Sequence, residues 1–286
     1  MKLRKSMMIN GILYNCEDWH GVTLKQIKSL KSIDEALLRS ILKSHSKTPK
    51  EFLYLELGVL PLRWIIAQRR IMFMKHIEAR HDEDLLKQVY LAQKENKTRG
   101  DFVELVTKDL ESLQISYDEV TSSLVSKEQF KKKLKASATN VAFESLKTKL
   151  LTHTKVKSIA YSQLKMQHYL YKSDLSSEEI VTLAAFRSQC VRGIRNNFKK
   201  MYGNNIICPL ICDSTAIDTQ EHLISCTKLI GDIDDRQLIK IQDIYGQLEK
   251  QEAAASLLTK LIKRRNTMLD KIEDPNSSSH SLPKKS

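Results

Sequence analysis

Glycine and proline are scarce in this sequence, and aromatic residues are few. Of its 286 residues, 8 are glycine and 5 are proline, while Phe, Trp and Tyr together make up 6%. Gly and Pro are the residues that most often mark turns, so their scarcity favours long helices over many short strands. The sequence contains no internal repeat and no strand-rich region. The composition therefore predicts an all-α protein.

Long hydrophobic runs are missing as well. The most apolar stretch, residues 52–68, is interrupted by Glu56 and Arg63, and it falls short of the roughly 18 uninterrupted residues that a membrane span requires. Residues 1–10 include basic residues but no apolar segment of signal-peptide length. Without a secretion signal, the 5 cysteines favour free thiols or a metal site over disulfides. We expect a protein that is neither secreted nor embedded in a membrane.

Catalytic motifs are also absent. The sequence has no glycine-rich loop that could hold a phosphate and no nucleophile elbow. Glu221 and His222 do not form a metalloprotease motif, because the second histidine of that motif is missing. The acidic run at residues 232–235 lies in a helical pattern, where it is interpreted as the start of a helix. We expect no enzymatic activity from this chain.

Helix-start signals divide the chain into segments. Capping boxes at residues 23–26 and 176–179, and Thr48 followed by Pro49, each precede apolar residues at helical spacing. The predicted helices cover residues 24–43, 48–58, 61–80, 83–94, 101–113, most of 126–172, 176–190 and 234–272. In the third of these, we expect Arg63, Arg69 and Arg70 to lie on the solvent side.

These segments predict an all-α fold with several packed helices, a small Cys/His zinc knuckle and a C-terminal helix. The expected regions are listed in chain order. They are an N-terminal helical region at 1–125, a basic helical region at 126–203, the knuckle at 204–228, the C-terminal helix at 229–273 and a disordered tail at 274–286.

Positive charge is the strongest compositional feature. The formal net charge is +13, and residues 126–172 contain eleven lysines against two glutamates. A lysine-rich helix face could follow a phosphate backbone, and the alternative is a solvated face without a ligand. The candidate nucleic-acid contacts in this region are Lys131, Lys132, Lys133 and Lys135.

A second basic segment follows, in which aromatic residues alternate with cations. Phe186, Phe198 and Tyr202 lie among these cations, a composition that suits single-stranded nucleic acid because bases stack on aromatic rings. The alternative is that the two phenylalanines belong to the core. The candidate contacts here are Arg187, Arg192, Arg195, Lys199 and Lys200.

Three cysteines and one histidine have the spacing of a zinc knuckle. Cys208 and Cys212 are separated by three residues, His222 follows after nine more, and Cys226 after three more. A capping box beginning at Asp218 predicts a helix from about Thr219, which would place His222 and Cys226 on one helix face. Four protein ligands predict a structural zinc site and not a catalytic one. The alternative is a group of buried, reduced cysteines beside an exposed histidine.

Residues 12–19, 33–70 and 196–226 resemble the region that follows the reverse-transcriptase domain in LINE-type (non-LTR) retrotransposon polyproteins. The most specific part is MYG-x-N-x-x-CPLC followed by DTQEHL and Cys, from which this chain departs by one extra residue, Ile211. The resemblance implies a C-terminal segment that helps to bind template RNA or target DNA and acts in the nucleus, with the cytoplasm as the other possibility. It also implies that the catalytic palm lies in an upstream domain outside this chain. The competing hypothesis is a non-enzymatic helical interaction or structural protein.

Overall fold

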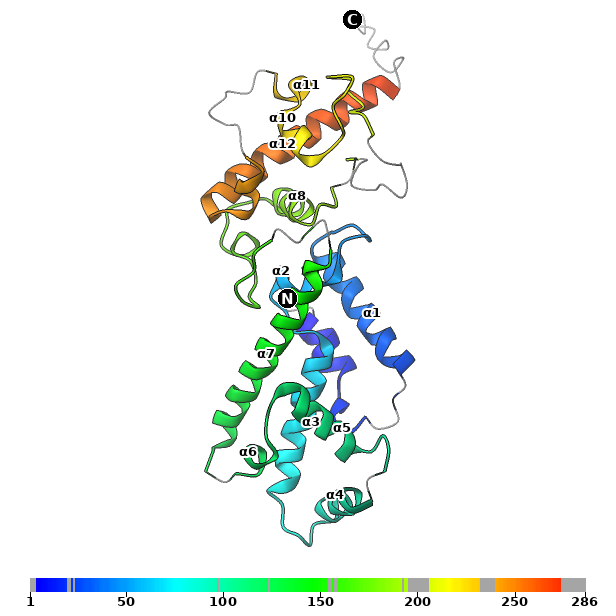
Figure 1. Cartoon of the computed structure of the whole chain (residues 1–286), viewed down its shortest axis with the longest axis vertical. Coiled ribbons are helices and arrows are strands. Elements are labelled where there is room, and N and C mark those ends of the chain that lie inside the picture. Colours follow the sequence, from blue (N-terminus) through cyan, green and yellow to red (C-terminus); the bar gives the residue numbers. More distant parts are fainter. Residues whose placement is uncertain are drawn as a thin grey trace, which may run out of the picture. The chain divides into compact units, whose positions relative to one another are not determined.

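The computed structural model describes residues 4–19, 22, 24–96, 98–122, 124–153, 156, 159–191, 193–194, 206–231 and 240–273. Within these ranges the protein is all-α (Figure 1), which confirms the predicted fold class. The extended pairings there are two isolated antiparallel bridges, Leu57 with Met166 and Ile207 with Ile217. None of the described helices combines the length and the apolarity needed to cross a bilayer.

The chain forms two compact units. Unit 1 comprises residues 1–40, 53–152 and 161–166, and unit 2 comprises residues 41–52, 153–160 and 167–286. The predicted boundary at residue 126 is wrong, because the lysine-rich helix that begins there packs inside unit 1. The helices of unit 1 are η1 (Arg4–Ile12), η2 (Cys16–Asp18), α1 (Leu24–Ile41), α3 (Leu62–Glu78), α4 (Leu85–Asn96), α5 (Phe102–Leu113), α6 (Tyr117–Thr121) and α7 (Lys127–Leu151), and α2 (Lys50–Leu57) begins in unit 2 and ends in unit 1.

Helix α3 is the central element of unit 1. It packs against η2 and against α4, α5, α6 and α7 (Figure 1). Its apolar residues, together with those of α5 and α7, form one buried cluster. On α7 the buried residues recur every fourth position, which leaves the rest of that helix to solvent. The buried members on α3 and α7 include Trp64, Ile71, Met74, Phe130, Leu134 and Ala138.

Local signals in the sequence explain where these helices begin and end. Asp101 accepts a hydrogen bond from the Glu104 backbone N–H at 2.8 Å, so it caps α5. Gly58 ends α2 with a φ of +59°, and a Cβ atom there would lie 1.9 Å from the Met166 backbone nitrogen. Only glycine fits that position without a shift of the backbone. Thr23, expected as the cap of α1, lies outside the described residues.

The arginines of α3 do not all face solvent, contrary to our expectation. Arg63 is exposed. Arg69 donates hydrogen bonds to the carbonyl oxygens of Ile9, at 2.7 Å, and of Leu13. Arg70 is buried and forms an ion pair with Asp109 of α5. A charge count along α3 could not reveal these partners, because they lie far away in the sequence.

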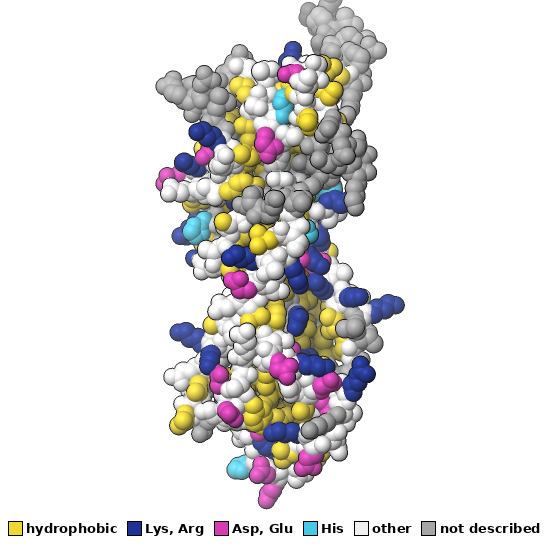
Figure 2. Space-filling model, in the orientation of Figure 1, with side chains coloured by type: hydrophobic (Ala, Val, Ile, Leu, Met, Phe, Trp, Pro, Cys, Tyr) yellow, Lys and Arg dark blue, Asp and Glu magenta, His cyan; other side chains and the backbone are white. Residues whose placement is uncertain are grey.

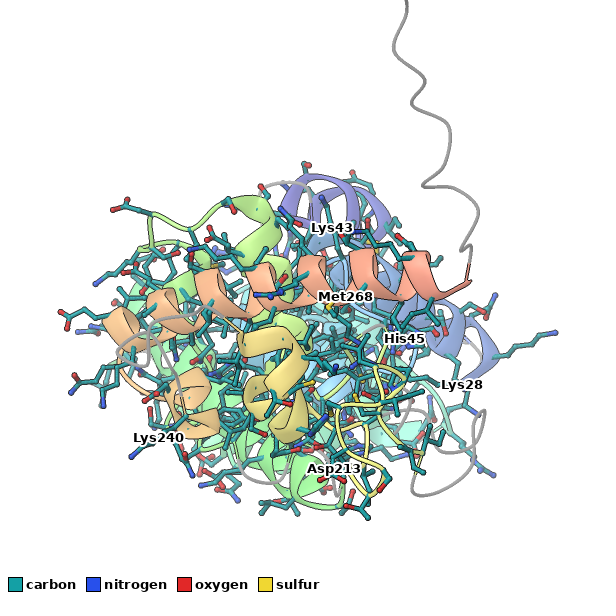
Figure 3. All side chains as sticks on the ribbon, turned by 90° about the horizontal axis from the view of Figure 1, so that it is seen from above. Lys28, Lys43, His45, Asp213, Lys240 and Met268 are labelled. Carbon is teal, nitrogen blue, oxygen red and sulfur yellow. The ribbon has the colours of Figure 1, made fainter. Side chains whose placement is uncertain are left out.

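Unit 2 is organised around its longest helix, α12 (Leu248–Glu273), which runs unbroken across Figure 3 and carries Met268. It contacts η3 (His168–Leu170), α8 (Ser177–Arg187), α10 (Gln220–Ser225), α11 (Thr227–Ile230) and η6 (Ile241–Tyr245). The predicted capping box at Ser176 and Glu179 is present at the start of α8. On α12, the side chains of Leu257, Leu258 and Leu261 are buried, and Ile262 is half-buried.

Two predicted helices are shorter in the structure. The helix expected over most of residues 126–172 ends at Leu151. The expected C-terminal helix is divided, because α11 ends at Gly231 with a φ of +44°, and η6 and α12 are separate helices. Positive φ is incompatible with continuing a right-handed helix. Residues 232–239 and the predicted disordered tail at 274–286 lie outside the described residues.

Candidate metal centre

The first two candidate ligands lie on a short hairpin-like loop. The Cys208 backbone N–H donates to the Ala216 carbonyl oxygen at 2.7 Å, and the Asp218 N–H donates to the Ile206 carbonyl oxygen at 2.7 Å. These two bonds join residues 206–208 to residues 216–218 and fold the chain back on itself. The turn that connects them carries Cys212.

The extra residue Ile211 is accommodated within a tight turn. Its N–H donates to the Cys208 carbonyl oxygen at 2.9 Å, and its φ is +48°, in the left-handed region. Its side chain is 76% exposed. The additional residue therefore changes the backbone at one position and leaves Cys212 directed at the same centre as Cys208.

The other two ligands come from helix α10 and its end. Thr219 caps α10, since its Oγ1 accepts a hydrogen bond from the His222 N–H at 3.0 Å. The predicted capping role of Asp218 is wrong by one residue, because Asp218 is fully buried and pairs with Arg265 of α12. Cys226 lies just after the last residue of α10, and its carbonyl oxygen accepts the first hydrogen bonds of α11.

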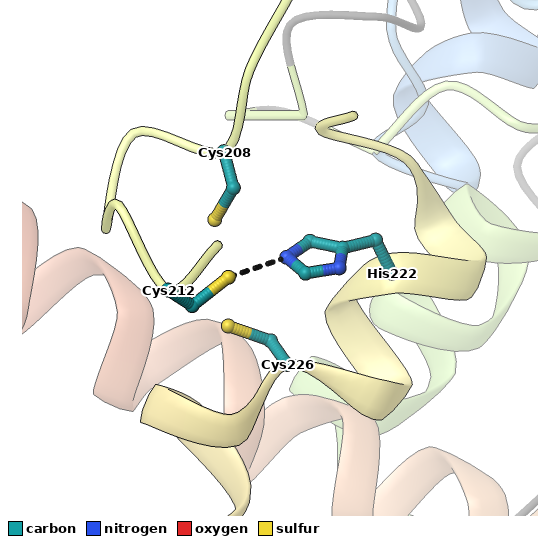
Figure 4. Close-up of side chains that lie close together, drawn as sticks. All are labelled: Cys208, Cys212, His222 and Cys226. Carbon is teal, nitrogen blue, oxygen red and sulfur yellow. Dashed lines mark hydrogen bonds between the residues drawn. The ribbon is translucent and has the colours of Figure 1, made fainter. Parts of the chain in front are cut away.

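The four side chains converge on one point (Figure 4). The Sγ atoms of Cys208, Cys212 and Cys226 and one ring nitrogen of His222 all lie within 4.8 Å of one another. Cys212 Sγ lies 3.1 Å from His222 Nε2. Ligands of a tetrahedral zinc ion lie roughly 3.5 to 3.8 Å apart, given typical bond lengths. These residues therefore fit a metal ion that prefers sulfur and nitrogen donors.

Burial and electrostatics agree with a metal-binding role. Cys208 and Cys226 are buried, and Cys212 and His222 are half-buried. Burial raises the pKa of the Cys208 thiol and also that of the Cys212 thiol. Three thiolates at this centre, two of them buried, would repel one another and lose hydration, and a divalent cation offsets both costs. Zinc is the metal that most often binds such a set.

Arg265 is a residue near this centre that the sequence interpretation missed. Its guanidinium donates to Asp218 Oδ2 at 2.9 Å and to the Gly193 carbonyl oxygen at 3.0 Å, lies 2.8 Å from Asp218 Oδ1 as an ion pair, and the side chain is 2% exposed. It follows Leu257 and Leu261 at four-residue intervals. That position on the apolar stripe is the signal by which the sequence could have predicted its burial.

The candidate nucleic-acid contacts on α7 lie on its surface. Lys131, Lys132, Lys133 and Lys135 are all exposed. Lys133 forms an ion pair with Glu119 of α6, whereas no ion pair is found for the other three within the described ranges. On the face shown in Figure 2, cationic side chains are interspersed with acidic ones.

The second basic segment is only partly described. Arg187 is buried, donates to the Ile244 carbonyl oxygen at 2.9 Å and lies 5.5 Å from the ring centroids of Tyr169 and Tyr245. The prediction that Arg187 contacts nucleic acid is therefore wrong, and its role is to hold η6 against α8. Phe186 is fully buried, in agreement with the core alternative. Arg192, Arg195, Lys199, Lys200, Phe198 and Tyr202 lie outside the described residues.

Comparisons of this chain with protein-family models, with curated proteins and with solved structures give no match. The resemblance to LINE-type reverse transcriptases therefore stays a prediction, and the chemistry of the metal centre is inferred from the side chains themselves.

Proposed function

We propose that this chain binds RNA or DNA as a C-terminal, non-catalytic segment of a LINE-type reverse transcriptase, with a structural zinc ion in the Cys/His cluster. The observation that supports the proposal is the convergence of Cys208, Cys212, His222 and Cys226 within 4.8 Å. These residues lie in the segment, 196–226, on which the resemblance depends. The proposed site of action is the nucleus, as in the family that the chain resembles.

The zinc ion would join the loop at residues 206–218 to helix α10. Four protein donors complete a tetrahedron and leave no position for a reactive water, so the role of the ion is structural. Two backbone hydrogen bonds join the two sides of the loop, and the others within it, such as Ile211 N–H to the Cys208 carbonyl oxygen, only close local turns. The free energy of metal binding would therefore contribute directly to folding of this segment.

The proposed contact surface for nucleic acid is the exposed side of α7. Lys131 and Lys135 are one helical turn apart and Lys132 is adjacent, so their ammonium groups can reach successive phosphates. Each phosphate contact releases counterions, which makes the affinity depend on salt. The overall charge of +13 would raise the association rate with any polyanion.

The test is to measure binding of labelled single-stranded RNA, single-stranded DNA and duplex DNA by fluorescence anisotropy, between about 50 and 200 mM salt. The variant Lys131→Gln, Lys132→Gln, Lys135→Gln should bind more weakly, and its slope of log affinity against log salt should fall by about 2 to 3. The matched control changes three other exposed lysines, Lys25, Lys28 and Lys43, to Gln (the last two are labelled in Figure 3). This control removes the same amount of positive charge from sites outside α7.

A second candidate function is a helical interaction protein whose lysines only keep it soluble. The mixture of acidic and basic side chains on the face in Figure 2 favours this alternative. Under it, the two triple variants lose the same small amount of affinity. Equal losses would therefore contradict the α7 contact surface and support the second function.

A further inference from the structure

Unit 1 contains a cavity between α4 and α5 that plays no part in the proposed function. Its volume is about 540 Å³, and residues of α3, α4, α5 and α6 line it. Pockets that bind small molecules usually measure roughly 300 to 1,000 Å³. The cavity is therefore large enough for one small ligand, and its lining indicates the chemistry of that ligand.

Two tyrosines form the aromatic part of the lining. The Tyr117 hydroxyl donates to Glu78, and Glu78 also accepts a hydrogen bond from Lys87. Tyr90 packs beside them and is buried. Burial, followed by the neighbouring Tyr117 hydroxyl, raises the pKa of Tyr90 far above its usual range, so this ring carries no negative charge. The rings are thus fixed before any ligand enters, which lowers the entropy that binding would cost.

Cationic side chains stand at the rim, beside the rings. Lys94 Nζ donates to the Tyr117 hydroxyl oxygen at 2.7 Å and lies 4.2 Å from the centroid of that ring. An ammonium group has three protons to donate, so Lys94 can also bind an anionic ligand. Arg99 lines the same cavity. Glu104, another rim residue, already accepts hydrogen bonds from Lys108 and from the Gly100 N–H, so its charge is compensated.

Asp101 leaves a hydrogen-bond acceptor unused. Its Oδ1 accepts the α5 cap hydrogen bond, while its Oδ2 is shielded from solvent and has no partner in the part of the chain that the structure describes. Asp101 also lines the cavity. A buried oxygen without a partner is uncommon in proteins. A ligand with an N–H donor would supply the missing hydrogen bond.

We propose that this cavity binds a nucleotide. The base would pack on Tyr90 and Tyr117, the phosphate would lie between Lys94 and Arg99, and an amino group of the base would donate to Asp101. A free nucleotide and one nucleotide within a single-stranded nucleic acid both offer this chemistry. The site is separate from the α7 lysines and does not depend on zinc.

The first test uses isothermal titration calorimetry of the full chain with adenosine monophosphate, adenosine, ribose 5-phosphate and inosine monophosphate. The last of these lacks the amino group. Adenosine monophosphate should bind at least about fivefold more tightly than ribose 5-phosphate, because stacking on the tyrosines is lost without the base. It should also bind more tightly than inosine monophosphate. Equal affinity for the nucleotide and for ribose 5-phosphate would overturn the proposal.

Variants then assign the contacts. The double variant Lys94→Gln, Arg99→Gln should bind adenosine monophosphate roughly tenfold more weakly and should bind adenosine with unchanged affinity. The charge-matched control Lys25→Gln, Lys28→Gln should change neither affinity. Asp101→Asn keeps a good helix cap and should remove the preference over inosine monophosphate. Unchanged nucleotide affinity in the first variant, with circular dichroism like that of the parent, would refute the site.

A competition experiment separates the two sources of the ligand. A single-stranded oligonucleotide that displaces adenosine monophosphate identifies a strand as a ligand, and one that does not displace it identifies the free nucleotide. The triple α7 variant of the proposed function should bind adenosine monophosphate like the parent. Loss of oligonucleotide binding in that variant with intact nucleotide binding would confirm that the two sites are independent.

Discussion

Arg265 of α12 and Asp218, next to the cap of α10, form a fully buried ion pair. The Arg265 Nη2 atom lies 2.8 Å from Asp218 Oδ1 and 2.9 Å from Oδ2, and the two side chains are 2% and 0% exposed. Asp218 also closes the loop that carries two of the cysteines, through its backbone N–H. The pair therefore joins the segment that carries the Cys/His cluster to the longest helix of unit 2.

Removing one partner of this pair should destabilise unit 2 strongly. Arg265→Met leaves the buried carboxylate of Asp218 unpaired, and Asp218→Asn leaves the buried guanidinium of Arg265 unpaired. Each substitution should lower the free energy of unfolding by about 3 to 5 kcal/mol. The double variant should cost clearly less than the sum of the two, because neither charge then remains unpaired. Chemical denaturation of all four proteins measures this coupling. Additive losses would contradict a direct interaction.

Removing a candidate ligand should abolish metal binding and unfold the surrounding segment. His222→Ala and Cys226→Ala should lower the zinc content from about one ion per chain and increase proteolysis within residues 204–228, because binding and folding are coupled there. Cys16→Ala is the matched control, since Cys16 is a buried cysteine of unit 1 outside the cluster. Elemental analysis and limited proteolysis provide the measurements. The zinc site would be wrong if parent and ligand variants resisted protease equally.

Replacing Ile211 by glycine should stabilise the loop. Ile211 is β-branched and has a φ of +48°, a conformation that costs an L-residue about 1 to 2 kcal/mol and costs glycine almost nothing. Its side chain is mostly exposed, so little burial is lost. The expected result is slower zinc release to a competing chelator. Ile207→Gly, in the paired part of the same loop, is the control and should speed the release.

Acid should weaken unit 1 through Glu78. Although burial raises the pKa of Glu78, hydrogen bonds from Lys87 and Tyr117 outweigh it and hold the pKa below its usual value of 4.5. A carboxyl whose pKa is lower in the folded state stabilises the fold above the unfolded pKa, and this contribution disappears as the pH falls through the folded value.

The variant Glu78→Gln tests this dependence. It should be less stable than the parent near neutral pH, and the difference should shrink well below pH 4.5. Urea unfolding at the two pH values measures the free energy of unfolding of each protein. A difference between parent and variant that stays constant with pH would show that the ionised carboxylate of Glu78 contributes no stability.

Local sequence signals predicted where many of the helices begin and end. The capping residues Asp101 and Ser176 and the terminating Gly58 stand where the structure has helix ends, because a cap or a positive φ depends only on adjacent residues. The spacing of the four metal ligands was likewise sufficient to predict their convergence. The prediction failed where one helical pattern hid several helices, as in residues 229–273.

The sequence by itself determined the all-α class, the start of most helices and the grouping of the four candidate metal ligands, since each depends on a short pattern. Only the tertiary structure decided which charged residues are buried. Arg70 and Arg187 resemble solvent-facing cations in the sequence, yet their partners lie 39 and 57 residues away. The tertiary structure also decided that Asp218 pairs with Arg265 and leaves the capping of α10 to Thr219, because a nearby buried guanidinium is a stronger partner for a carboxylate than a backbone N–H.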